Sequence, residues 1–172
     1  VDVGCDHAPF TADYAAVPVE MQQVAREFGH ERLCEVDPAE FDRRLPELRE
    51  KARPLTEIGT PVLVRIINDR GMLGTRNNTK EVFYQAGALS GELIAERHKH
   101  RDIACHGCPV ACGKLVSVPG GDFARRLVKM PEYETIYAMG SMIDNPDLVS
   151  IFNGNAQCDE MGMDTISFGV TL

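Results

Sequence analysis

Three cysteines within eight positions constrain this chain more than any other feature. Residues 104–113 read ACHGCPVACG, in which Cys105, Cys108 and Cys112 have the spacing CxxCxxxC. Thiolates at these intervals can converge on one centre if the first lies in a turn and the last two lie a helical turn apart. Pro109 suits the start of that helical turn, and amides at a helix start favour thiolates. The segment therefore predicts a metal centre.

Iron and sulfur suit this spacing better than zinc does. Structural zinc sites usually have two CxxC-like pairs separated by a loop, whereas three close cysteines and a remote one commonly hold a cubane cluster. Only three cysteines are local here, so Cys158 or Cys34 completes the set only if the fold brings one of them near. A structural zinc site and a turn lined by free thiols stay open as alternatives.

The composition and charge of the chain argue against several classes of protein. With 26 acids against 18 bases, the net charge of −8 argues against a nucleic-acid partner, which would need a basic stripe. The sequence contains no apolar run of the roughly 18 to 20 residues that a bilayer span requires, so we expect no membrane partner. The opening VDVGCDHAPF has no secretory pattern, and the scattered cysteines make a poor disulfide framework. We expect a reducing, cytoplasmic compartment.

Helix signals dominate the first half of the chain, so the predicted fold class is mainly α. Asp37 as N-cap and Pro38 at the first position predict a helix with one apolar face on a core. That face carries Phe41, Leu45 and Leu48. Residues 55–70 read as a buried helix or a short strand ended by Gly71.

The second half carries further start, stop and loop signals. GTRNNTKE, residues 74–81, is loop-like, and Ser90 caps a helix over SGELIAERHKH. SVPGGDF, residues 117–123, predicts a break, followed by the basic surface segment ARRLVK. A last helix is predicted from the cap Asn145 and the first residue Pro146 to about Met161. Gly162 suits its left-handed end and Met163 the apolar residue after it.

Three segments, in order, resemble the tungsten-containing aldehyde ferredoxin oxidoreductase family. They are RDIACHGCPVACGK, PEYETIYAMGS and NAQCDEMGMDTISFG, with GMLGTRN as a looser match. The resemblance covers residues 36–172 and implies a partial, irregular helical domain like the middle domain of that family. Residues 1–35 form an unassigned N-terminal segment.

The resemblance implies the cofactors and partners. In that family a 4Fe-4S cluster lies beside a tungsten (or molybdenum) held by two pterins, and electrons pass to ferredoxin or another carrier. Cys105, Cys108 and Cys112 would be three of the cluster's ligands. The family's fourth cysteine comes from a later segment that this sequence lacks, so we expect a fragment that is inactive by itself. A homo-oligomer is compatible with this interpretation.

DEMGMD, residues 159–164, resembles the family's first pterin-binding motif, DxxGLD. The resemblance implies that Asp159, Gly162, Met163 and Asp164 bind a pterin. Asp159 near a helix end can accept hydrogen bonds from pterin NH groups, and Gly162 lets the backbone approach the ring. Met163 in place of leucine conserves volume. Without the resemblance, the two aspartates would be solvated helix-end carboxylates.

PEYET, residues 131–135, offers Glu132 and Glu134. The resemblance implies that one glutamate of this segment lies by the metal and assists proton transfer, and its position favours Glu134. A carboxylate walled off from water would have the raised proton affinity that this role requires. From the residues alone, a surface glutamate is the alternative. The family often carries a cysteine after the glycine matched by Gly140, so the substrate class stays open.

The implied activity is oxidation of a small aldehyde, or a related carbonyl compound, to a carboxylic acid. One alternative is an iron–sulfur electron-transfer module without substrate chemistry. The other is a structural zinc-binding domain.

Overall fold

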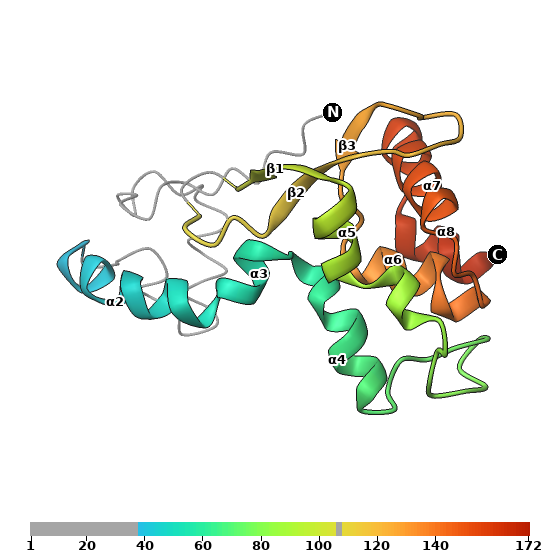
Figure 1. Cartoon of the computed structure of the whole chain (residues 1–172), viewed down its shortest axis with the longest axis horizontal. Helices are drawn as coiled ribbons and strands as arrows, with labels where there is room; N and C mark the ends of the chain where they lie inside the picture. Colours follow the sequence, from blue (N-terminus) through green and yellow to red (C-terminus); the bar gives the residue numbers. More distant parts are fainter. Residues whose placement is uncertain (1–37, 106–107) are drawn as a thin grey trace, which may run out of the picture. The chain divides into compact units, whose positions relative to one another are not determined.

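The computed structural model describes residues 38–105 and 108–172. These residues form seven α-helices, several 3₁₀ turns and one small sheet (Figure 1), so the mainly α prediction is confirmed. They divide into two units. The first unit contains residues 38–53 and the described part of 104–111, and the second contains residues 54–103 and 112–172.

Helix α2 (Pro38–Lys51) lies in the first unit and begins at the predicted residue. Its predicted cap, Asp37, lies outside the described residues. Leu48 is 39% exposed, so the prediction that it packs on a core is wrong. The physical reason is that more than half of the helix is charged, which leaves only a narrow apolar stripe.

The second unit begins with short helices. α3 (Arg53–Glu57) leads into a 3₁₀ turn at Thr60–Val62 and then α4 (Leu63–Asp69), so the apolar run at 62–69 is helical rather than a strand. Gly71, with a φ of +67°, ends this segment as predicted. The loop predicted at 74–81 is also confirmed, with an antiparallel bridge between Thr75 and Lys80.

Helix α5 (Gly91–Arg97) follows a 3₁₀ turn at Ala86–Leu89. Ser90 caps it as predicted, since its side chain accepts a hydrogen bond from Leu93 N at 3.3 Å. The helix is shorter than predicted because Lys99 already belongs to a strand. Ser117 N donates to His98 O at 2.9 Å, so strand pairing takes over where the helical ladder stops.

Three antiparallel strands form the sheet, in the order β1 (Lys99–Ile103), β2 (Gly113–Ser117) and β3 (Leu127–Lys129). The β1–β2 register pairs Ile103 with Gly113, and the β2–β3 register pairs Leu115 with Lys129. The predicted break at 117–123 falls between β2 and β3. The segment ARRLVK lies at the surface as predicted, with only Val128 half-buried, and its second half forms β3.

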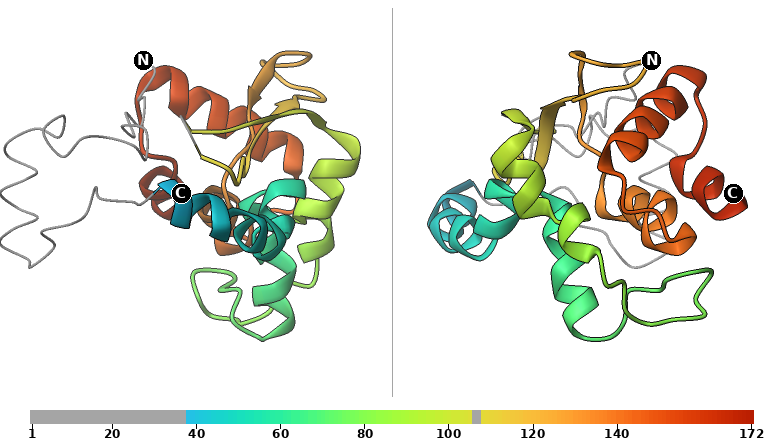
Figure 2. Two further views of the ribbon diagram at one scale, coloured as in Figure 1. Left: turned by 90° about the vertical axis from the view of Figure 1, so that its left-hand side faces the viewer. Right: turned by 45° about the vertical axis from the view of Figure 1, so that its right-hand side comes forward.

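Helices α6 (Tyr133–Met139), α7 (Leu148–Met161) and α8 (Thr165–Thr171) complete the second unit, with a 3₁₀ turn at Ser141–Ile143. Figure 2 shows α7 and α8, in red, beside α6, in orange. α7 starts two residues later than predicted, because Asp147 rather than Asn145 accepts the capping hydrogen bond from Val149 N at 3.0 Å. Its end is as predicted: Gly162 has a φ of +66°, and Met163 N donates to Cys158 O at 2.9 Å.

One apolar core holds the second unit together, and it draws on α4, α5, β2, α6 and α7. Its largest fully buried apolar side chains are Val64, Leu73, Phe83, Leu89, Ile94, Val116, Val118, Met130, Ile136, Ile151 and Phe152. The core fixes the backbone of α6 and α7, which carry the predicted glutamate and the start of the predicted pterin motif.

Candidate functional site

The cysteine segment closes the β1–β2 hairpin. Pairing of Ile103 with Gly113 ends the ladder, and all three cysteines fall in the connection between these residues. They are free thiols; Cys105 is exposed, and Cys108 and Cys112 are half-buried. Cys108 N donates to Cys105 O at 3.0 Å, so the first cysteine lies in a turn as predicted.

The predicted helical turn after Pro109 is wrong. Residues 108–112 adopt bends and irregular backbone. Ala111 has a φ of +50°, and a left-handed residue cannot continue a right-handed helix. Helix amides therefore do not supply the positive potential at Cys112.

A buried lysine supplies positive charge there instead. Lys114 is fully buried, and its Nζ donates to Thr56 O at 2.8 Å and to Cys112 O at 3.3 Å. The same ammonium lies 3.1 Å from Asp102 Oδ1, which is also 2.8 Å from Lys99 Nζ. Although desolvation works to raise the pKa of Asp102, hydrogen bonds and charges from the two lysines outweigh it and hold the pKa below its usual value.

Sequence reasoning missed Lys114, although a signal was present. Strand side chains alternate between faces, so Lys114 shares a face with Val116, and both are fully buried. An inward position in a strand is a place where a lysine needs specific partners.

Gly59 lets a second segment approach Cys112. Its φ is +93°, and a Cβ built there would lie 2.9 Å from Cys112 O. A side chain at this position would both strain the backbone and push against the carbonyl. Glycine therefore allows the end of α3 to lie close to the third cysteine.

The two glutamates of PEYET have different surroundings. Glu132 precedes α6, and its Oε2 accepts a 2.5 Å hydrogen bond from Thr60 Oγ1. It also pairs with Lys129 Nζ at 3.2 Å. Glu134 lies in the first turn of α6 and is exposed, so the residues that the structure describes do not enclose it as expected for an acid/base group.

The four residues of the predicted pterin motif form one corner between α7 and α8. Asp159 lies in the last turn of α7, and Gly162 is its left-handed C-cap. Asp164 caps α8, accepting a 2.7 Å hydrogen bond from Ser167 N. Met163 between them is 41% exposed, and a Cβ at Gly162 would meet no atom within 4 Å. The corner is open, so these residues fit a flat ligand with NH donors.

The pKa values of the two aspartates in this corner are shifted in opposite directions. Desolvation raises the pKa of Asp159, although the charge of Lys129 works against this shift. Hydrogen bonds from Ser167 lower the pKa of Asp164. Asn155 Nδ2 is the nearest donor described for Asp159 and lies 3.4 Å from its Oδ2. That long contact leaves acceptor capacity for another donor.

Tertiary packing joins this corner to the glutamate segment. Thr135 Oγ1 and Thr165 Oγ1 lie 2.7 Å apart in a hydrogen bond between α6 and α8. Thr135 follows Glu134, and Thr165 follows Asp164. The glutamate segment and the predicted pterin corner, about thirty residues apart in the sequence, therefore lie at the starts of two helices that contact each other.

A family model described as "Aldehyde ferredoxin oxidoreductase, domains 2 & 3" matches residues 39–172, which is most of the chain. The chain belongs to this aldehyde ferredoxin oxidoreductase family. The family match includes the cysteine loop, the glutamate segment and the α7–α8 corner.

Relatives named tungsten-containing aldehyde ferredoxin oxidoreductase support the assignment. The protein from Thermococcus kodakarensis is 42% identical over 118 residues, covering 69% of this chain and 19% of the relative. The protein from Pyrococcus horikoshii is 39% identical over 152 residues, covering 84% of this chain and 24% of the relative. The chain thus spans about a fifth to a quarter of the length of these family members.

Cys158 is a poor candidate for a cluster ligand in this family member. It is 1% exposed within the apolar core, and desolvation raises the pKa of its thiol. Cys34, the other candidate fourth ligand, lies outside the described residues. Among the residues that the structure does describe, no three His, Cys, Asp or Glu side chains are grouped closely enough to hold a metal ion. The three-cysteine site therefore stays a prediction.

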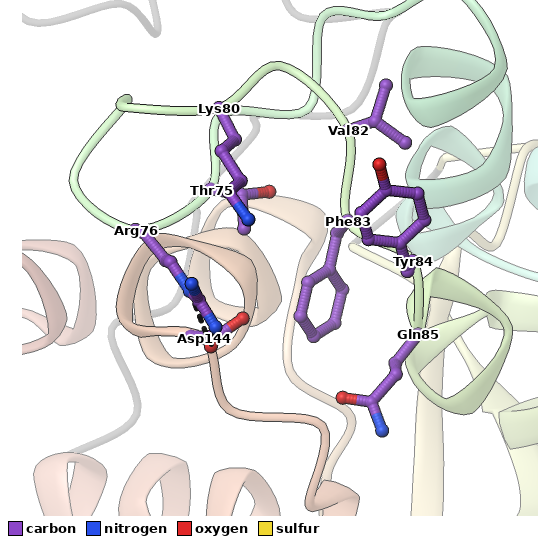
Figure 3. Close-up of a pocket in the computed structure, with 8 residues that line it drawn as sticks. All are labelled: Thr75, Arg76, Lys80, Val82, Phe83, Tyr84, Gln85 and Asp144. Carbon is purple, nitrogen blue, oxygen red and sulfur yellow. Dashed lines mark hydrogen bonds and ion pairs between the residues drawn. The ribbon is translucent and has the colours of Figure 1, made fainter.

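None of the predicted site residues lines the small cavity that the second unit contains. It measures about 180 Å³ and is bounded by the 74–81 loop, the following segment and Asp144 (Figure 3). Arg76 and Asp144 close one side through contacts of 2.6 and 2.7 Å. This volume is below the roughly 300 Å³ of a usual ligand site.

In the described part of the chain, no helix is long and apolar enough to cross a membrane.

Proposed function

We propose that this chain is part of an oxidoreductase that converts aldehydes to carboxylic acids at a tungsten (or molybdenum) bis-pterin centre. One aldehyde and one water give one carboxylic acid, two protons and two electrons. The electrons leave through a 4Fe-4S cluster to ferredoxin or a similar carrier. The free thiols suit a reducing, cytoplasmic compartment.

The observation that carries this proposal is the 2.7 Å hydrogen bond between Thr135 and Thr165. It brings the start of α6, with Glu134, against the start of α8, with Asp164. An acid/base carboxylate and a pterin-binding corner must be neighbours if both serve one metal centre.

The corner between α7 and α8 would hold the pterin. Asp159 accepts hydrogen bonds from the NH groups of the ring, and the left-handed Gly162 lets the backbone come close to it. Met163 offers an exposed apolar side chain against the ring face. When bound, the metal pterin supplies the two-electron chemistry.

Cys105, Cys108 and Cys112 would hold three irons of the cluster. All three are free and at least partly accessible, as ligands to an incoming cluster must be. Glu134 would take or return the proton that accompanies oxidation.

Anaerobic purification followed by visible spectroscopy and metal analysis tests the proposal. We expect a brown protein that contains tungsten or molybdenum, iron and sulfide. A brown protein without either pterin metal would indicate an electron carrier, and a colourless protein with zinc a structural domain. Either result would reject the proposed function.

A matched pair of cysteine variants tests the ligand assignment. Cys108→Ser should lose the visible absorption of the cluster, because serine is a poor iron ligand. Cys158→Ala should keep it, since Cys158 packs in the apolar core. Loss of the cluster in Cys158→Ala, with the fold retained by circular dichroism, would instead make Cys158 a ligand.

A further inference from the structure

Asn155 places a buried amide in the otherwise apolar face of α7. Its side chain belongs to a residue that is 5% exposed. The other buried residues of this helix are Leu148, Ile151, Phe152, Ala156 and Cys158. Burial of an amide costs free energy unless its polar atoms find partners, so an aliphatic residue would fill this position at a smaller penalty. The amide therefore indicates a role beyond packing.

The amide nitrogen of Asn155 has two hydrogen-bond partners. Nδ2 donates to Lys129 O, at the end of β3, over 3.3 Å and to Asp159 Oδ2 over 3.4 Å. Asn155 and Asp159 are four residues apart, so they lie on the same face of α7. An amide nitrogen carries two protons, so these two bonds use both and hold the side chain in one orientation. The backbone of β3 thus fixes the amide that contacts Asp159.

Asp159 keeps one oxygen for an incoming donor. Within the part of the chain that the structure describes, no donor contacts its other oxygen, Oδ1. The residue itself is exposed. The bond from Asn155 is long, so it restricts the carboxylate without using up its capacity to accept. Oδ1 therefore remains to accept an NH group of a bound ring.

Lys129 contributes to the same arrangement through its charge. Its Nζ pairs with Glu132 Oε1 at 3.2 Å. Desolvation raises the pKa of Asp159, and the charge of Lys129 works against that shift. One lysine thus holds Asn155 through its carbonyl and favours the charged form of Asp159 through its ammonium. A charged carboxylate is the stronger acceptor for NH donors.

We propose that Asn155 is a positioning residue that fixes Asp159 to accept the NH groups of the bound pterin. This inference rests on the proposed function. Without Asn155, the exposed carboxylate would rotate more freely in water. Binding of the ring would then have to restrict that rotation, which weakens the interaction.

The rate of pterin release tests this inference in the anaerobically purified oxidoreductase of which this chain is a part. The fluorescence of the free, oxidised pterin after dilution measures that rate. Asn155→Leu should release the pterin about two to ten times faster than the wild type, which is the change expected from one weakened hydrogen bond.

Asn153→Leu is the matched control on the same helix. The side chain of Asn153 also holds a distant segment, since it donates to Gly120 O at 2.8 Å and accepts from Phe123 N at 3.0 Å. Its replacement removes comparable hydrogen bonds but none to Asp159. We expect this variant to release the pterin within about a factor of two of the wild-type rate.

A pH titration of this chain followed by nuclear magnetic resonance gives a readout that packing alone would not move. In the wild type, the Nδ2 resonance of Asn155 should shift with the same midpoint as the carboxyl carbon of Asp159, whereas that of Asn153 should not follow it. In Asn155→Leu the pKa of Asp159 should be higher than in the wild type, because the charged carboxylate loses a donor.

The two measurements together decide the outcome. Faster release in Asn155→Leu than in Asn153→Leu, with a shared midpoint for Asn155 and Asp159, supports the inference. Equal release rates, or an Asn155 resonance that does not follow Asp159, overturn it. If Asn155→Leu does not fold, the wild-type titration decides by itself. A wild type that holds no pterin rejects the proposed function, and this inference with it.

Discussion

Thr60 caps α6 from a distant part of the chain: its Oγ1 donates to Glu132 Oε2 at 2.5 Å and accepts a hydrogen bond from Tyr133 N at 3.0 Å. The side chain of Glu132, at the N-cap position, forms no capping hydrogen bond to its own helix. A threonine beside α4 therefore fixes the start of the helix that carries Glu134.

Thr60→Val should lower the free energy of unfolding by about 1 to 2 kcal/mol, because it leaves both partners without their hydrogen bond. Chemical denaturation followed by circular dichroism measures the change. Thr79→Val is the matched control, since the hydroxyl of Thr79 donates within its own exposed turn, to Arg76 O at 2.7 Å. We expect the control to stay within about 0.5 kcal/mol of the wild type. Equal effects of the two substitutions would contradict a special role for Thr60.

In the proposed oxidoreductase of which this chain is a part, Glu134→Gln should reduce aldehyde oxidation by about 10² to 10⁴-fold while the metal content and the fold stay unchanged, because it removes a proton acceptor from the proposed site. Steady-state kinetics of the metal-loaded protein measures the loss. Glu132→Gln is the control at the neighbouring glutamate; it weakens the pair with Lys129 but keeps an acceptor for Thr60. A larger loss of turnover in Glu132→Gln would transfer the acid/base role to that residue.

Gly169→Ala should destabilise the chain by about 1 to 3 kcal/mol through overpacking. A Cβ at Gly169 on α8 would lie 2.7 Å from the carbonyl carbon of Ala138 on α6. Gly87→Ala is the matched control, since its Cβ would meet nothing within 4 Å, and it should be neutral or slightly stabilising. Thermal unfolding of the two variants measures the difference, and a neutral Gly169→Ala would mean that the helices can separate without penalty.

Asp159→Asn should stabilise the protein without cofactor at pH 7 by less than about 1 kcal/mol, given the screening at this exposed residue. Burial raises the pKa of Asp159 in the folded state, so its stabilising contribution is complete below its ordinary pKa and is lost as pH rises through the folded value. The advantage of the variant should therefore vanish as the pH falls. Denaturation between pH 7 and pH 3 measures this trend.

Asp164→Asn should have the opposite sign. Hydrogen bonds from Ser167 lower the pKa of Asp164, so its contribution is present above its ordinary pKa and is lost as pH falls through the folded value. The variant should be less stable than the wild type at pH 7 and should approach it in acid. If both substitutions changed stability in the same direction at pH 7, the opposite pKa shifts assigned to Asp159 and Asp164 would be wrong.

Local signals in the sequence predicted several features correctly. Ser90 starts α5, Gly162 ends α7, and the family motifs lie in one matched stretch of chain. These features depend on hydrogen bonds between residues a few positions apart, so the amino acids involved are enough to predict them.

Only the tertiary structure decided the rest. The burial of Lys114, the contact of Thr135 with Thr165 and the cap that Thr60 gives to α6 all join residues far apart in the chain. The left-handed Ala111, which rules out the predicted helical turn, lies just before the start of β2. Such features depend on which surfaces pack together. The free energy of that packing comes from many residues far apart in the chain, so no single position predicts it.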